Sequence, residues 1–269
     1  MSKTILITGS SSGIGKATAI YFAEQGWNVV ATMRTPEKAG EWAKHNNITL
    51  TKLDVLDEAL IQQAINDTIN KFGTIDAVVN NAGYGLVGAF EASTNEQIQR
   101  QFDTNVFGLM NVCREIIPHF RERRSGTIIN VASMGGRLTF PLYSLYHGTK
   151  WAVEGFSESL QFELQPFNIR IKIIEPGAIK TDFYDRSMDV MTKPGLTAYD
   201  AYVKKAMTNM NKFGETAPGP EKVAAVIFKA ATDGSGQLRY QVNSAQLLAL
   251  RRLLPLSWFQ SIVRKVVLK

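Results

Sequence analysis

Residues 4–15 read Thr-Ile-Leu-Ile-Thr-Gly-Ser-Ser-Ser-Gly-Ile-Gly, an apolar run followed at once by a glycine- and serine-rich loop. The run predicts a buried strand over residues 3–8. From Ile14 to Gln25 apolar residues recur at three- and four-residue spacing, which predicts a helix that Gly26 ends. Glycines let the backbone approach a pyrophosphate, and free N–H groups at the helix start attract the anion. We therefore expect a dinucleotide-binding loop made of Gly9, Ser10, Ser11, Ser12, Gly13, Ile14 and Gly15.

The alternation of strand and helix continues along the chain. Further strands are predicted over residues 28–33, 48–54, 75–80, 127–131, 170–175 and 237–242. Further helices are predicted over residues 37–45, 57–72, 95–123 (with one break near Pro118), 143–164 and 221–231. This order is typical of a doubly wound (Rossmann), mostly parallel sheet with helices on both faces. We expect one α/β domain with seven strands over residues 1–245 and a C-terminal extension over residues 246–269.

The positive charge of the chain is concentrated in the extension. The whole chain holds 30 Lys and Arg against 24 Asp and Glu, a net charge of +6. Residues 246–269 contain no acid and five of the cations, which are Arg251, Arg252, Arg264, Lys265 and Lys269. The other residues are therefore nearly neutral, with 25 basic and 24 acidic side chains. Nucleic-acid binding needs a broad basic face with stacking aromatic residues, so we expect no nucleic-acid partner.

Cysteine and histidine usage predicts neither a disulfide nor a metal site. Cys113 is the lone cysteine, which fits a reducing compartment. The histidines His45, His119 and His147 lack metal-ligand spacing. No apolar run approaches the ~20 residues that span a bilayer, and the N-terminus lacks a signal-peptide pattern. We therefore expect a cytoplasmic protein.

The end of the second predicted strand indicates which nucleotide is bound. NAD-binding units usually place an acid there, roughly 20 residues after the glycine loop, to hold the ribose hydroxyls. Here the strand ends at Met33 and Arg34, and no acid appears before Glu37. The planar guanidinium of Arg34 can pair with a 2′-phosphate. We therefore expect NADP(H) to be favoured over NAD(H).

Further short motifs follow in one order, at the carboxyl ends of predicted strands or in the helices after them. They are Asp54-Val55, Asn80-Asn81-Ala82-Gly83, Asn105, Ser133, Tyr146-x-x-x-Lys150, Pro176-Gly177 and Thr181. Each motif is weak by itself, but the ordered set is specific. Together with the glycine loop, it resembles the short-chain dehydrogenase/reductase family over residues 4–181. The branch that it resembles holds steroid- and retinol-type dehydrogenases and broad bacterial oxidoreductases.

The resemblance implies a catalytic set of Asn105, Ser133, Tyr146 and Lys150. In this set, Tyr146 is the general acid/base, and Ser133 donates to the substrate oxygen that gains negative charge. Lys150, one helical turn from Tyr146, lowers the pKa of the Tyr146 hydroxyl and reaches the nicotinamide ribose. Asn105 anchors a water that links the lysine to solvent. His147 lies between Tyr146 and Lys150 and is expected to point away from their shared face.

The resemblance also implies cofactor contacts and a reaction. The contacts are Asp54 and Val55 at the adenine, Asn81, Ala82 and Gly83 along the cofactor, Tyr146 and Lys150 at the nicotinamide end, and Pro176, Gly177, Ile179 and Thr181 at the nicotinamide amide and diphosphate. The reaction is NADP(H)-dependent interconversion of a ketone or aldehyde and an alcohol by hydride transfer, on a moderately apolar small molecule. Two alternatives stay open. One is a membrane-associated enzyme of lipid-like alcohols such as steroids or retinoids, and the other is a catalytically silent NADP(H)-binding regulator.

Two segments are expected to shape the substrate side. Residues 183–213, rich in Met, Phe and Tyr, match the family's substrate lid and predict an apolar, adaptable pocket; the alternative is core packing of a helix near residues 200–212. The extension predicts two amphipathic helices broken at Pro255. It is expected to cover the substrate opening or a subunit interface, with an anionic membrane surface or a loose end as alternatives. Apolar positions on the 95–123 and 143–164 helices predict a homodimer or homotetramer.

Overall fold

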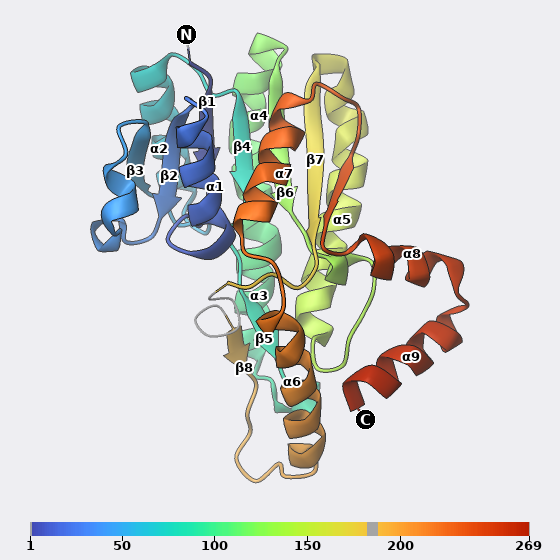
Figure 1. Cartoon of the computed structure of the whole chain (residues 1–269). Helices are drawn as coiled ribbons and strands as arrows, with labels where there is room; N and C mark the ends of the chain where they lie inside the picture. The colour runs from blue at the N-terminus through green and yellow to red at the C-terminus, as the bar shows by residue number, and fades with distance from the viewer. Residues whose placement is uncertain (1, 182–187, 269) are drawn as a thin grey trace.

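The computed structural model describes residues 2–181 and 188–268. Seven strands form one parallel sheet in the order β3-β2-β1-β4-β6-β7-β9 (Figure 1). The predicted doubly wound α/β architecture is confirmed, and the strand ends lie within two residues of the predicted ones. The bounds are β1 (Thr4–Ile7), β2 (Asn28–Met33), β3 (Ile48–Lys52), β4 (Ala77–Asn80), β6 (Gly126–Val131), β7 (Ile169–Pro176) and β9 (Arg239–Val242).

Helices cover both faces of this sheet (Figure 1). One face carries α1 (Gly13–Glu24) and α7 (Glu221–Thr232), and the other carries α2 (Glu58–Phe72), α4 (Gly108–Arg123) and α5 (Ser144–Leu164). Strands buried on both faces are apolar without alternation, and Ile5, Leu6 and Ile7 of β1 are all fully buried. Because the strands are parallel, their carboxyl ends meet at one edge of the sheet, where ligands of such folds bind.

The long helix predicted over residues 95–123 is interrupted at a different place. It divides into α3 (Asn95–Phe102), a π-helical segment (Asp103–Phe107) and α4, and Pro118 lies inside α4. The predicted break near Pro118 is therefore wrong. The helix continues because Ile116 and Phe120, on either side of the proline, are fully buried against the sheet, and this packing outweighs one missing backbone hydrogen bond.

Two further local differences lie at the margins of the sheet. The helix predicted over residues 37–45 is a pair of 3₁₀ turns, Pro36–Lys38 and Glu41–Lys44, because Ala39 between them has extended backbone. A small parallel sheet of β5 (Gly85–Val87) and β8 (Met188–Val190) was not predicted. It joins the chain after β4 to the segment that continues into α6 (Asp200–Glu215).

The C-terminal extension forms the two predicted helices, α8 (Ala245–Leu253) and α9 (Leu256–Leu268), with Pro255 between them. Helix α9 packs on α6 through Phe259, Val263 and Val267, which are buried. The interpretation of the extension as a loose end is therefore wrong, because an anchored apolar stripe holds it to the domain.

Candidate active site

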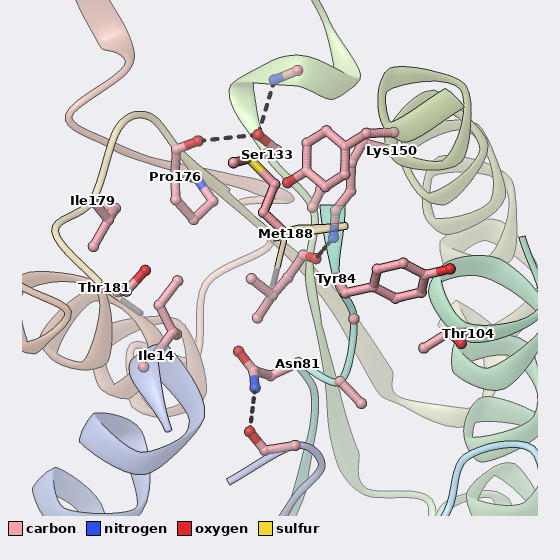
Figure 2. Close-up of a pocket in the computed structure, with 18 of the residues that line it drawn as sticks. Ile14, Asn81, Tyr84, Thr104, Ser133, Lys150, Pro176, Ile179, Thr181 and Met188 are labelled. Atoms are coloured by element: carbon pink, nitrogen blue, oxygen red, sulfur yellow. Dashed lines mark hydrogen bonds between the residues drawn. The ribbon is translucent and has the colours of Figure 1, made fainter. Parts of the chain in front are cut away.

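A cavity of about 790 Å³ lies at the carboxyl edge of the sheet (Figure 2). Its walls come from the residues that follow six neighbouring strands, so the motifs that are scattered along the sequence meet in one space. The predicted site residues that line it are Gly9, Ser11, Ser12, Gly13, Ile14, Arg34, Asp54, Val55, Asn81, Ala82, Gly83, Ser133, Tyr146, Lys150, Pro176, Gly177, Ile179 and Thr181. Ser10, Gly15 and Asn105 are buried behind the wall instead.

The glycine loop leaves no room for side chains at two of its positions. A Cβ on Gly9 would lie 2.8 Å from the Ala82 Cα, and one on Gly15 would lie 2.3 Å from the Gly9 carbonyl oxygen. The Asn81 side-chain amide donates to the carbonyl oxygens of Thr8 and Gly9, each at 3.0 Å (Figure 2). Helix α1 begins at Gly13 with no acid in its first turn. The loop therefore offers backbone N–H groups and a helix N-terminus, which suit the pyrophosphate of a nicotinamide dinucleotide.

Arg34, Asp54 and Val55 mark the end of the cavity beside β2 and β3. Arg34 follows the last residue of β2 and is exposed, so its guanidinium can reach an anion in the cavity. Asp54 accepts a hydrogen bond from the Leu56 N–H at 3.1 Å, which fixes the turn after β3. The residues present therefore fit the adenosine end of a dinucleotide.

Ser133 and Lys150 lie on the opposite wall (Figure 2). Ser133 Oγ accepts from the Gly135 N–H at 3.1 Å and donates to the Pro176 carbonyl oxygen at 3.5 Å. Lys150 Nζ donates to the Val131 carbonyl oxygen at 2.9 Å and lies 5.7 Å from the centre of the Tyr146 ring. Two hydroxyl groups and an ammonium thus border one part of the cavity, an arrangement that can donate to and protonate a substrate oxygen.

Burial sets the charge properties of this wall. Lys150 is 8% exposed, and desolvation lowers the pKa of its ammonium to about 8, against a smaller opposing effect of Glu154. Behind it, the Arg239 guanidinium lies 3.0 Å from Glu154 and 3.3 Å from Glu175. Burial, and then the neighbouring Glu175 carboxylate, raise the pKa of Glu154. An ion-pair network therefore supports the helix turn that carries Lys150.

Asn105 braces the cavity from behind. It lies in the π-helical segment and is 2% exposed. Its Oδ1 accepts from the Tyr84 N–H at 3.0 Å, and its Nδ2 donates to the Tyr84 carbonyl oxygen at 2.8 Å and to Thr149 Oγ1 at 3.2 Å. The side chain thereby ties the loop after β4 to α5. The predicted water that links Lys150 to solvent stays a prediction.

His147 was expected to point away from the face that Tyr146 and Lys150 share, but it borders the same cavity as they do. It lines the cavity wall, where its Nδ1 accepts from the Phe140 N–H at 3.4 Å. Burial lowers the pKa of His147 to about 4. One residue along a helix turns by about 100° from Tyr146, and the loop after Ser133 folds over that face. No local sequence pattern indicates the path of this loop.

The cavity wall contains an ion pair that sequence reasoning missed. Arg100 donates to the Tyr84 hydroxyl at 3.1 Å and forms an ion pair with Asp189. The three residues line the cavity, and the ion pair joins α3 to β8. Arg100 and Asp189 are 89 residues apart, so no local pattern could indicate the pair.

The two interpretations of the residues 183–213 segment both apply within its described part. Met188 and Met210 line the cavity, as an apolar lid would. Met210 is also buried in a cluster with Ala206 and α9, as core packing would require. Tyr199, Tyr202 and Phe213 are exposed instead. Residues 183–187 lie outside the described residues.

Within residues 2–181 and 188–268, no three His, Cys, Asp or Glu side chains are grouped as metal ligands. Over the same residues, no helix has both the length and the apolarity required to cross a bilayer.

Comparisons with known proteins place the chain among enzymes. It is 39% identical to an uncharacterised oxidoreductase of Bacillus subtilis, with 98% of both chains covered. It is 35% identical to 3-ketodihydrosphingosine reductase of Bacteroides thetaiotaomicron, covering 89% of this chain and 87% of that protein. It is 34% identical to retinol dehydrogenase 8 of Bos taurus, covering 94% of this chain and 86% of the relative.

Solved structures agree with these relatives. A short-chain dehydrogenase from Streptomyces avermitilis superposes with a TM-score of 0.82 at 32% identity, over 98% of both chains. ElxO with NADP bound gives 0.73 at 26% identity, over 90% of this chain and 98% of ElxO. A 3-ketoacyl-(acyl-carrier-protein) reductase from Brucella melitensis complexed with NADH gives 0.74 at 28% identity, over 89% of this chain and 96% of that chain. The family model for short chain dehydrogenases matches residues 3–190, and the chain belongs to this family of oxidoreductases.

Proposed function

We propose that the protein interconverts a ketone or aldehyde and an alcohol on a moderately apolar small molecule, with NADP(H) as cofactor. One observation carries the proposal: a single cavity joins the glycine loop and Arg34 to a wall that carries Ser133, Tyr146 and Lys150. A silent cofactor-binding regulator would have no need for hydroxyl donors and a buried ammonium at the far end of its nucleotide site. The proposed location is the cytoplasm, as the sequence predicts.

Each polar group on this wall has a proposed part in the reaction. A bound nicotinamide supplies the hydride for reduction or takes it up in oxidation. The Tyr146 hydroxyl gives its proton to the carbonyl oxygen, while Ser133 Oγ donates a hydrogen bond to the same oxygen. The ammonium of Lys150 favours loss of the tyrosine proton because opposite charges attract. Asn105 holds the loop after β4 in position through the backbone of Tyr84.

The preference for NADP(H) is proposed from Arg34. Relatives of known structure hold NADP in one case and NADH in another, so the choice of nucleotide depends on this chain's own residues. Arg34 lines the cavity directly after β2, where a carboxylate would otherwise bind ribose hydroxyls. A guanidinium there favours the additional phosphate of NADP(H).

The enzyme is also proposed to be a homodimer or homotetramer. Phe107, Trp151 and Phe162 are 50%, 48% and 67% exposed, on the π-helical segment before α4 and on α5. Large apolar side chains gathered on one side are typical of a subunit interface. Light scattering of the parental protein tests this, and a monomer would contradict it.

A lipid-like alcohol or ketone is a second candidate substrate. Met188 and Met210 give the cavity an adaptable apolar wall, and two relatives carry the names retinol dehydrogenase 8 and 3-ketodihydrosphingosine reductase. A panel of short aldehydes and ketones, sterols and long-chain 3-keto lipids, with NADPH consumption as the readout, distinguishes the two classes.

The decisive variant is Tyr146→Phe, which removes the transferable proton and keeps the ring. Turnover of the best substrate is expected to fall by roughly 10²–10⁴-fold, with the dissociation constant for NADPH unchanged. Tyr202→Phe on α6, an exposed tyrosine outside the cavity lining, is the matched control. Near-parental turnover by Tyr146→Phe would show that another group moves the proton. A parental protein that binds NADPH and oxidises it with no member of the panel would favour the regulator.

A further inference from the structure

We propose that the C-terminal helices α8 and α9 dock the protein on an anionic membrane surface, with Trp258, Ile262 and Val266 inserted among the lipids. The inference goes beyond the proposed reaction and does not depend on it. It follows from how the two faces of α9 are used, from the charge of the segment and from its length.

One face of α9 is occupied by the protein itself. Phe259, Val263 and Val267 recur every four residues and are 2%, 8% and 1% exposed. They pack against α6, and Asn209 of α6 donates to the Val267 carbonyl oxygen at 3.0 Å. Helix α9 is therefore held in a fixed orientation, and its other faces are presented to the surroundings.

A second apolar stripe lies beside the buried one. Trp258, Ile262 and Val266 also recur every four residues, so they share one side of the helix, and they are 65%, 39% and 50% exposed. Leu253 at the end of α8 and Leu256 at the start of α9 are also exposed, at 80% and 50%. Single exposed apolar residues are ordinary, but three that share one side of a helix form an apolar stripe, and exposed apolar surface of this kind marks an interaction site.

The positive charge around this stripe favours an anionic partner. Residues 245–268 contain Arg251, Arg252, Arg264 and Lys265 and no acid. Lys265 follows Ile262 by three residues and Trp258 by seven, so it borders the exposed stripe. Arg252 precedes the exposed Leu253 directly. Cations beside an apolar stripe complement a surface with acidic headgroups and acyl chains.

A second copy of the chain fits this patch less well. A closed dimer would place the same patch against itself, and the cations of the two copies would then face each other. Tryptophan at the edge of an apolar stripe is typical of the boundary between water and lipid. With 13 residues, α9 is shorter than the ~20 that span a bilayer. The helix therefore lies in the plane of the membrane surface.

Docking in this way leaves the catalytic wall free. Among the described residues that line the cavity, none follows Met210. Met210 itself contributes both to the cavity wall and to the cluster under α9. No described residue of α8 or α9 lines the cavity, and the expectation that the extension covers the substrate opening stays a prediction.

Co-sedimentation of the full chain with vesicles tests the proposal. Phosphatidylcholine vesicles that contain phosphatidylserine should carry the protein down at low salt, and vesicles of phosphatidylcholine alone should not. W258S/I262S/V266S is expected to partition at least ~10-fold more weakly, because three apolar anchors are lost. R252E/K265E should lose the preference for phosphatidylserine. Phe90→Ser, at a residue that is 58% exposed and remote from the extension in sequence, is the matched control and should bind as the parent does.

Trp258 also provides a direct optical test. Brominated lipids in the phosphatidylserine vesicles should quench part of the tryptophan fluorescence of the parental protein. The Trp258→Phe variant should lose this quenching, although the variant should still sediment with the vesicles. Melting temperatures equal to the parental one show that the exposed substitutions leave the fold intact. Equal sedimentation of the parent and W258S/I262S/V266S would overturn the proposal. So would a smaller oligomer of that variant in light scattering, because the patch would then belong to a second copy.

Discussion

The two ends of the cavity are built in different ways. At the nucleotide end, backbone atoms lie so close together that a Cβ on Gly15 would be 2.3 Å from the Gly9 carbonyl oxygen. At the substrate end, side chains form the wall, among them Met188, Met210 and the exposed ion pair of Arg100 and Asp189. We therefore expect the first end to be rigid, because its backbone is close-packed, and the second to adjust to its ligand, because methionine side chains have three rotatable bonds.

This difference indicates where substitutions are tolerated. Close-packed backbone cannot move to accept an added methyl group. Methionine side chains and surface ion pairs can rearrange at little cost. The nucleotide end is therefore expected to be sensitive to single atoms, and the substrate end is expected to be the place where related enzymes change specificity.

The largest effect is expected from Gly15→Ala at the nucleotide end. The added methyl group must displace the Gly9 carbonyl or Asn81, so the free energy of unfolding should fall by about 3 kcal/mol, and NADPH binding should weaken with it. Gly155→Ala in α5, where a Cβ meets no atom within 4 Å, is the control. It should raise stability by up to about 1 kcal/mol. Urea unfolding measures the free energy of unfolding, and fluorescence titration measures the NADPH dissociation constant. Equal values for Gly15→Ala and Gly155→Ala would contradict the expected sensitivity of the nucleotide end.

Lys150 lies at the boundary of the two ends, and its buried ammonium should make the free energy of unfolding depend on pH. Its folded-state pKa of about 8 is below the ordinary 10.5, so the unfolded chain binds more protons between these values. Stability should therefore rise as the pH increases from about 8 to 10.5. Lys150→Met removes this rise and should stabilise the fold by up to about 3 kcal/mol at pH 7. Urea unfolding at pH 7 and pH 10 measures the free energy of unfolding, and Lys204→Met, at an exposed lysine, is the control. If Lys150→Met stabilised the fold equally at both pH values, the lowered pKa of Lys150 would not be the cause.

A smaller and more selective effect is expected at Arg34. Arg34→Ala should weaken NADPH binding by about ten- to a hundredfold, because a charged hydrogen-bonded partner of phosphate is worth roughly 1.5–3 kcal/mol. NADH binding should be unchanged, since NADH lacks the 2′-phosphate. Equal dissociation constants of the parent for the two cofactors would contradict the assignment. Separate titrations of parent and variant provide the measurement.

The smallest effect is expected at the ion pair of the substrate end. Asp189→Asn removes the charge that faces Arg100, in a pair whose side chains are 36% and 57% exposed. Exposed ion pairs contribute about 0–1 kcal/mol, so KM for the substrate should change by less than about fivefold, with the NADPH dissociation constant unaffected. A larger change in KM would contradict the expectation that the substrate end tolerates substitution better than the glycine loop does.

The same contrast explains what the sequence could predict. The nucleotide end depends on local signals: a glycine loop between a strand and a helix, and a change of residue type at Arg34. The strands of the main sheet were predictable because β1, for instance, is a continuous apolar run. The substrate end depends on contacts between distant segments, such as β5 with β8 and Arg100 with Asp189, and no local pattern predicts such pairs.

Two errors in the prediction of single elements have physical causes. Pro118 suggested a helix break, but the buried neighbours Ile116 and Phe120 keep α4 continuous. His147 was expected to point away from the face that Tyr146 and Lys150 share, yet it borders the cavity. Helix spacing indicates which residues share a face, but it does not indicate which loop folds over another face. The loop that carries Phe140 covers it.

The π-helical segment at Asp103–Phe107 makes the active site depend on the number of residues as well as on their identity. A π turn contains an extra residue relative to the α-helix in which it is embedded. Deletion of one residue here would restore a regular α-helix, and it would rotate the residues on one side of the deletion by about 100° relative to those on the other side. Asn105 would then swing away from the Tyr84 backbone although no side chain had been substituted. The length of this segment is therefore as important as its residues. In alignments of related chains, we expect no gap across it in any chain that has the asparagine at this position.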